Sequence, residues 1–103
     1  MNAPHLGTFI YRYEGGNVYE VHATADDRLH WRCLAGDDQG READETVHRV
    51  AVRPDVHFLS WVETDGLVVT QVVDFAAMTV NCVLVLPEGE RIVLQGVLEK
   101  QTV

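Results

Sequence analysis

The 103-residue chain is poor in basic residues and has no long apolar run. Lysine and arginine together number 8 against 16 aspartates and glutamates, which gives a formal net charge of −8. Because this acidity repels phosphate backbones, we expect no nucleic-acid partner. No stretch approaches the roughly 20 apolar residues that a membrane-spanning helix needs, so we expect no membrane partner either.

Cysteine is also scarce, with Cys33 and Cys82 too far apart for a C-x-x-C motif. Each lies in an apolar run, which favours two reduced core thiols and leaves a disulfide between them as the alternative. The histidines form no His-x-His or His-x-x-x-His pair, so no metal site is expected. There is no glycine-rich phosphate loop, and we expect no cofactor. The start, Met1–Gly7, is neither basic nor apolar, which predicts no secretory signal and a cytoplasmic location.

What the chain does have is a rhythm of eight short alternating or apolar runs that fill nearly all of its length. We expect strands at Thr8–Tyr13, Val18–Thr24, Arg28–Leu34, Glu45–Arg53, Val56–Glu63, Leu67–Asp74, Met78–Leu86 and Arg91–Glu99. The segment Ala35–Asp44 is expected to be a polar loop, and Phe75–Ala77 at most a short helical turn. Short connections require antiparallel neighbours. The sequence therefore predicts an all-β fold, an eight-stranded antiparallel up-and-down β-barrel, with one domain over residues 1–103.

The two-residue period of a strand decides which side chains reach the inside of such a barrel. Phe9, Tyr11 and Tyr13 share one side of the first expected strand, and Trp61 and Glu63 share one side of the fifth. If these sides face inward, two phenols and a carboxylate share an apolar lumen. A buried carboxylate is costly unless it is neutralised or paired, which makes this lumen a candidate site.

The same residues carry a resemblance. The run Tyr11–Glu20, a tyrosine pair followed by a glycine turn and a Tyr-Glu pair, resembles the opening motif of bacterial phenolic acid decarboxylases. Gly40-Arg41 and Ser60–Gly66 are similar to two further segments of that family. The resemblance implies a lipocalin-like (calycin) barrel in which tyrosines hold the carboxylate of a hydroxycinnamate while arginine and glutamate manage the proton. By position these roles fall on Tyr11, Tyr13, Arg41 and Glu63.

A second resemblance covers nearly the whole chain. The segment Phe58–Leu98, with Trp61–Gly66, Val73–Phe75 and Gln95–Leu98, is similar to the small MoaF-like proteins. These share the calycin barrel and have no general assigned reaction, so this resemblance supports the fold more than any function.

The sequence leaves two functions open. In the first, the barrel binds a small carboxylated or aromatic molecule and acts as a cofactor-free lyase or isomerase, with Tyr11, Tyr13, Arg41 and Glu63 as catalytic residues. Further contacts with the ligand are expected from Phe9, Tyr19, Trp31 and Trp61. The alternative is a non-catalytic ligand-binding or interaction module. The simpler reading of Glu63 is a solvated strand end. A third, structural possibility is that side chains such as Phe9, Trp31 and Trp61 fill the barrel completely and leave no pocket.

Self-association is a further expectation. The segments Leu67–Val69 and Val83–Leu86 are apolar on both faces of a strand. Because one face of each strand is needed for the core, the other face suggests a surface covered by a partner copy. We therefore expect a homodimer.

Overall fold

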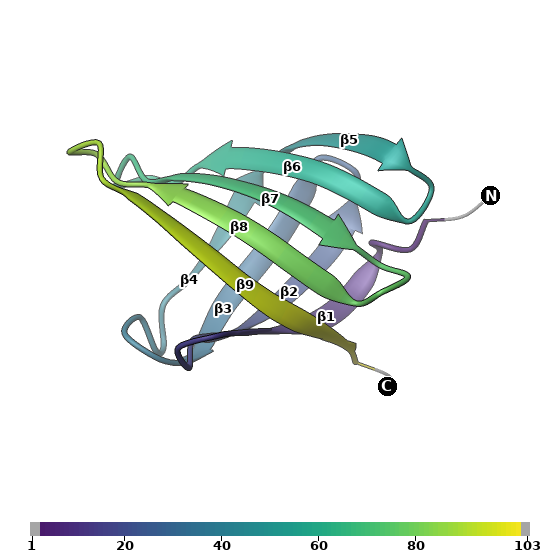
Figure 1. The fold of residues 1–103 in the computed structure, drawn as a ribbon, viewed down its shortest axis with the longest axis horizontal. Coiled ribbons are helices and arrows are strands. Elements are labelled where there is room, and N and C mark those ends of the chain that lie inside the picture. The colour runs from purple at the N-terminus through teal and green to yellow at the C-terminus, as the bar shows by residue number, and fades with distance from the viewer. Residues whose placement is uncertain (1–2, 102–103) are drawn as a thin grey trace.

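The computed structural model describes residues 3–101, and among these it contains nine β-strands and no helix (Figure 1). The strands are β1 Gly7–Tyr13, β2 Val18–Ala25, β3 Arg28–Ala35, β4 Glu42–Thr46, β5 His48–Arg53, β6 Val56–Val62, β7 Val68–Asp74, β8 Thr79–Val85 and β9 Arg91–Lys100. No helix in this part of the chain is long and apolar enough to cross a membrane.

All nine strands belong to one antiparallel sheet in the order β4-β3-β2-β1-β9-β8-β7-β6-β5. The sheet curls round until its two end strands approach each other, which makes a nearly closed barrel (Figure 1). The first and last strands of the chain lie side by side in the middle of the sheet, with Tyr11 opposite Leu98. This pairing joins the meander β1–β4 to the meander β5–β9.

The prediction of eight strands was wrong, because the expected strand Glu45–Arg53 divides at Val47. Residues before Val47 form β4, which pairs with β3, and residues after it form β5, which pairs with β6 at the opposite end of the sheet. Val47 is buried at this corner, and its N–H donates to the Asp27 carbonyl at 2.8 Å. One continuous segment of the sequence therefore supplies both end strands of the sheet.

Two expected connections also differ. The loop predicted at Ala35–Asp44 is shorter, because Glu42 already pairs with Arg32 in the sheet. Phe75–Ala77 forms a turn without helix. The Asp74 carboxylate accepts hydrogen bonds from the N–H groups of Ala76 and Ala77, both at 2.9 Å, which satisfies these amides without a helical turn.

Inside the barrel, the alternation of buried and exposed residues follows the two-residue period of the strands. Phe9, Tyr11 and Tyr13 point inward, as predicted. Cys33 and Cys82 are both buried and both free thiols. On β1 the buried residues other than Ile10 are aromatic, whereas the hydrophobic core residues of β7 and β8 are Val69, Val73, Val80 and Cys82.

At the seam between β1 and β9 the two backbones approach closely at Gly96. A Cβ at this position would lie 2.5 Å from the Arg12 carbonyl oxygen and 3.0 Å from the Tyr13 Cα. Because these neighbours are backbone atoms, they cannot move aside without opening the seam.

Replacing Gly96 by alanine should therefore lower the free energy of unfolding by about 1–3 kcal/mol, the usual cost of overpacking. The measurement is denaturant unfolding, with Gln95→Ala as the control because Gln95 is exposed on the same strand. Equal stability of Gly96→Ala and wild type would show that the seam tolerates a side chain.

Candidate functional site

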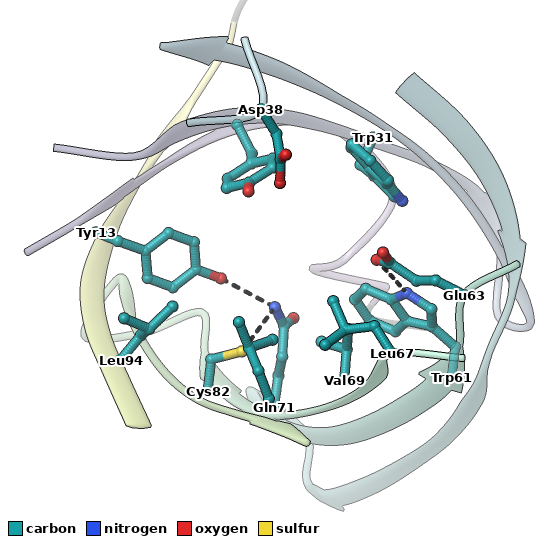
Figure 2. A pocket seen from close by; sticks show the side chains of 12 residues that line it. Tyr13, Trp31, Asp38, Trp61, Glu63, Leu67, Val69, Gln71, Cys82 and Leu94 are labelled. Carbon is teal, nitrogen blue, oxygen red and sulfur yellow. Dashed lines mark hydrogen bonds between the residues drawn. The ribbon is translucent and has the colours of Figure 1, made fainter. Parts of the chain in front are cut away.

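A cavity of about 100 Å³ lies inside one end of the barrel (Figure 2). Its wall combines aromatic and aliphatic side chains with a few polar groups. The residues that line it are Tyr13, Tyr19, Trp31, Asp38, Trp61, Glu63, Leu67, Val69, Gln71, Cys82, Leu84 and Leu94. Figure 2 shows Tyr13 on one side of this space and Trp61 with Glu63 on the other.

Glu63 is held in place by the turn that follows β6. Its N–H donates to the Leu67 carbonyl at 2.8 Å, and its own carbonyl accepts from the Gly66 N–H at 2.9 Å. The side chain is thereby directed along the inner side of β6, where the Trp61 indole Nε1–H donates to Glu63 Oε2 at 3.2 Å. Figure 2 shows this bond at the cavity wall.

The surroundings of Glu63 favour its protonated form. Burial is the largest cause that raises the pKa of this carboxyl above its usual value of 4.5. The Trp61 hydrogen bond opposes that rise, while the negative charges of Glu45 and Asp65 add to it. A carboxyl group with a raised pKa in a cavity can give and take a proton closer to neutral pH.

A second carboxylate, Glu45 on β4, lies buried in the same barrel with 8 % of its surface exposed. The Trp31 indole Nε1–H donates to Glu45 Oε2 at 2.9 Å. The barrel thus holds two tryptophan–glutamate pairs, and the charge of one glutamate acts on the other. Sequence analysis missed Glu45 because it treated the segment before it as a loop. The pairing of β4 with β3 places Glu45 opposite the inward-facing Leu29.

Across the cavity, Gln71 connects two further polar groups. Its Nε2 donates to the Tyr13 hydroxyl oxygen at 2.9 Å and lies 3.8 Å from the Cys82 sulfur (Figure 2). Burial raises the pKa of Tyr13, and it raises that of Cys82 to about 11. Both groups are therefore protonated at neutral pH, which makes Tyr13 a hydrogen-bond donor and Cys82 a poor nucleophile. Sequence analysis missed Gln71, although its two-residue spacing from Val69 and Val73 marks it as inward.

Of the eight residues predicted for the site, five line the cavity: Tyr13, Tyr19, Trp31, Trp61 and Glu63. Tyr11 and Phe9 are buried further along the barrel. The Tyr11 ring centroid lies 6.4 Å from that of Tyr13, and the Phe9 centroid lies 5.4 Å from that of Phe75.

Arg41 stands outside the cavity wall with 57 % of its side chain exposed. Its Nη1 lies 3.4 Å from Oδ1 of Asp38, which lines the cavity. Its positive charge still reaches Glu63, because it lowers the pKa of that carboxyl. The structure thus places the predicted arginine at the rim of the cavity.

The barrel also contains a polar cluster outside this cavity. His5 Nε2 bonds Asp26 Oδ1 at 2.8 Å, and Arg49 Nη1 donates to His57 Nδ1 at 2.9 Å. The two imidazole centroids are 5.0 Å apart, and Nδ1 of the buried His5 has no hydrogen-bond partner. Burial, followed by the Arg49 charge, lowers the pKa of both histidines. Among residues 3–101, no group of three or more His, Cys, Asp or Glu side chains is placed to hold a metal ion.

Comparisons with known proteins agree with this architecture. A family model described as MoaF-like matches residues 7–99. A crystal structure from Burkholderia vietnamiensis, provisionally described as a beta-lactamase, has the same fold with a TM-score of 0.88. It is 23% identical in sequence, and the match covers 98% of this chain and 99% of that one. No curated protein sequence matches the chain.

The Trp61–Glu63 bond can be tested by its effect on proton affinity. Replacing Trp61 by phenylalanine removes the N–H that stabilises the ionised carboxylate, so the pKa of Glu63 should rise further. The measurement is a pH titration of the carboxyl carbon by NMR, with the signal assigned through Glu63→Gln. Trp31→Phe is the control, because its indole bonds Glu45 instead. A pKa that falls or stays constant in Trp61→Phe would contradict the role given to this bond.

The histidine cluster predicts a dependence of stability on pH. Because the folded state lowers the pKa of His5 and His57 below the usual 6.5, the unfolded chain binds more protons as the pH falls. The contribution of the two histidines to the free energy of unfolding should therefore be complete above about pH 7 and decline as the pH drops below 6.5. His30 acts in the opposite direction, because hydrogen bonds to Asp44 and Glu42 raise its pKa. The contribution of the cluster must therefore be isolated by comparing variants.

His57→Asn retains an acceptor for Arg49 but does not titrate, so it should reduce the loss of stability between pH 7 and pH 5.5. The measurement is denaturant unfolding at a series of pH values. His22→Asn is the control, because His22 is exposed on the outer side of β2. Identical pH profiles for His57→Asn and wild type would count against the cluster.

Proposed function

Since the family model matches residues 7–99, the chain belongs to the MoaF-like family, and we propose that its barrel binds a compact aromatic or carboxylated small molecule beside Glu63. The observation that carries this proposal is the half-buried carboxyl group with a raised pKa at the wall of an aromatic-lined cavity. Polar groups that converge in an apolar cavity are the usual signature of a ligand site. The calycin relationship implied by the sequence motifs is part of this proposal.

The size of the cavity limits the ligand. Ordinary small-molecule sites have volumes of roughly 300–1,000 Å³, whereas this cavity has about 100 Å³. A single ring with a short substituent is the largest group we expect to enter without movement of the wall. The faces of Trp31, Trp61 and Tyr19 supply flat apolar surfaces for such a ring.

A carboxylate on the ligand would find its donors among the phenols. No lysine, arginine or histidine is among the residues that line the cavity. Tyr13 and Tyr19 are both protonated at neutral pH, because burial raises their pKa values, so both hydroxyls can donate. Protonation of Glu63 would remove the charge that repels an anionic ligand. Arg41 would add a positive charge if its guanidinium left Asp38 and turned over the rim.

The chemistry that fits these groups is proton transfer without a cofactor, as in a lyase or isomerase. In a decarboxylation, the bond from the ligand to its carboxylate breaks, and CO₂ leaves without the electron pair. Glu63 supplies the proton that takes the place of the carboxylate and then recovers one from water. The motif resemblance to phenolic acid decarboxylases supports this reaction class.

A non-catalytic binding module of the MoaF-like type is the second candidate. The exposed position of Arg41 favours it, because no basic side chain in the cavity wall fixes and orients a substrate carboxylate for reaction. The two candidates differ in one observable result. A binding module returns its ligand chemically unchanged.

A thermal-shift screen against hydroxycinnamates and smaller aromatic acids, followed by product analysis of each hit, tests both candidates. For an enzyme, Glu63→Gln should lower turnover by at least about 100-fold, the usual weight of a general acid. The variant should still be stabilised by the ligand, because glutamine can accept the Trp61 hydrogen bond.

The control for this experiment is Glu88→Gln, an exposed carboxyl group in the turn before β9, which should behave as wild type. Loss of binding and turnover together in Glu63→Gln would contradict a purely chemical role for Glu63. Ligands that stabilise the protein but are recovered unchanged would support the binding module. No stabilisation by any small aromatic acid would contradict both candidates.

A further inference from the structure

The outside of the barrel is apolar on one half. Of the described residues with large exposed apolar side chains, all except Leu6 lie on β5, β6, β7 or β9. Ile92 is on the cavity side of β9, opposite Leu84, and does not belong to the outer face. The residues that do belong to it include Val72 in the middle of β7, with 43% of its surface exposed, and Val93 on β9, with 60%. Contiguous apolar surface of this kind on a protein commonly marks an interface.

The strand register brings these side chains into rows. Phe58 on β6 lies between Val50 on β5 and Val72 on β7. In the neighbouring row, Val83 on β8 lies opposite Val93 on β9. The outward positions of the three central strands β6–β8 carry one charged residue, Asp74 at the end of β7. Depletion of charge at the centre is what distinguishes the core of a protein interface from ordinary surface.

The two hydroxyl groups in the middle of this face, on Ser60 and Thr70, are hydrogen-bonded within the sheet. Ser60 Oγ donates to the Val69 carbonyl at 2.9 Å and lies 3.0 Å from Thr70 Oγ1. Because these two side chains satisfy each other within the sheet, covering them leaves no unpaired polar group. Asn81 on β8 is the polar exception, because it is exposed beside Val72 and its amide needs a hydrogen-bond partner from the second copy when this face is buried.

The other half of the barrel wall is different. Its outward positions on β2, β3 and β4 carry ion pairs, among them Arg32 with Glu20 at 3.3 Å and His30 with Glu42 at 2.9 Å. A chain of net charge −8 repels copies of itself. Contact through the uncharged half keeps the acidic halves of two copies apart, whereas contact through the charged half would bring them together.

We propose that the outer face of β6–β8, with the adjoining parts of β5 and β9, binds a second copy of this chain in a two-fold symmetric dimer. Because the sheet curves into a barrel (Figure 1), β6–β8 are the strands that can face one partner directly. Three strands of about seven residues outline roughly 23 by 14 Å, from about 3.3 Å per residue and 4.8 Å between strands. The exposed side chains of β5 and β9 at the margins of this outline, such as Val50 and Val93, must supply the rest of the roughly 600 Å² per partner that a small specific interface needs. In the dimer the two outer faces would pack against each other as two sheets do, about 10 Å apart.

The same face offers little to an anionic lipid surface, because attraction to such a surface needs a cluster of basic residues. The opening of the ligand cavity lies elsewhere, near the turns that hold Asp38 and Glu63. The dimer therefore leaves the cavity accessible, and its existence does not depend on the proposed function.

Analytical ultracentrifugation of the whole chain over a range of concentrations tests the dimer. We expect a species of twice the monomer mass of 11.5 kDa, with little dependence on salt because the contact is apolar. Val72→Lys should raise the dimer dissociation constant more than roughly tenfold, since each copy would bury an unpaired charge. Thr24→Lys, at an outward position on the charged half, is the matched control and should dimerise as wild type.

Val93→Lys provides a second variant of the same face, and circular dichroism establishes that each variant is folded. A wild-type chain that stays monomeric at all concentrations overturns the proposal. So does a dimer that survives both Val72→Lys and Val93→Lys, or one that is lost in Thr24→Lys. Ligand binding measured on the same samples separates this result from the fate of the proposed function.

Discussion

The pairing of β1 with β9 is the contact on which the rest of the molecule depends. It joins residues near the two ends of the described chain, so folding must close a loop of nearly the whole sequence before the pairing stabilises anything. The cavity of the candidate site exists because of this pairing. Tyr13 on β1 reaches Gln71 on β7 across the barrel because β9 and β8 bring the two strands round to face each other. Without this seam there would be two separate meanders and no enclosed cavity.

Inside the closed barrel, the two glutamates are tolerated because each is paired with an indole. An N–H donor stabilises a buried carboxylate without contributing a full positive charge. Glu63 therefore keeps a raised pKa, whereas an ion pair with an arginine would have lowered it. The position of Arg41 at the rim fits this balance, because its charge reaches Glu63 only weakly from there. The arrangement therefore combines a carboxyl group of raised pKa with a cavity wall that holds no basic side chain among its lining residues.

The sequence was sufficient for those features that follow from alternation. The two-residue period places Trp61 and Glu63 on one side of their strand, whatever the order of the strands. It left open whether that side faces inward, which the structure decides. The corner at Val47 could not be read in the same way, because the alternation of inward and outward residues continues through it from Glu45 to Arg49. The hydrogen bond from Val47 to Asp27 that marks the corner is a tertiary contact. Missing the corner also hid Glu45, whose direction depends on where β4 begins.

Arg41 shows a second limit of sequence reasoning. It lies between strands, where no period fixes the direction of a side chain, and the nearby acid Asp38 decides its position. The outer face of β6–β8 shows the opposite case. The two-residue period assigns its outward positions, and these mix valines such as Val72 with polar residues such as Thr70 and Asn81. The pattern therefore marks this face as poor in charge, which is the premise from which the dimer is proposed.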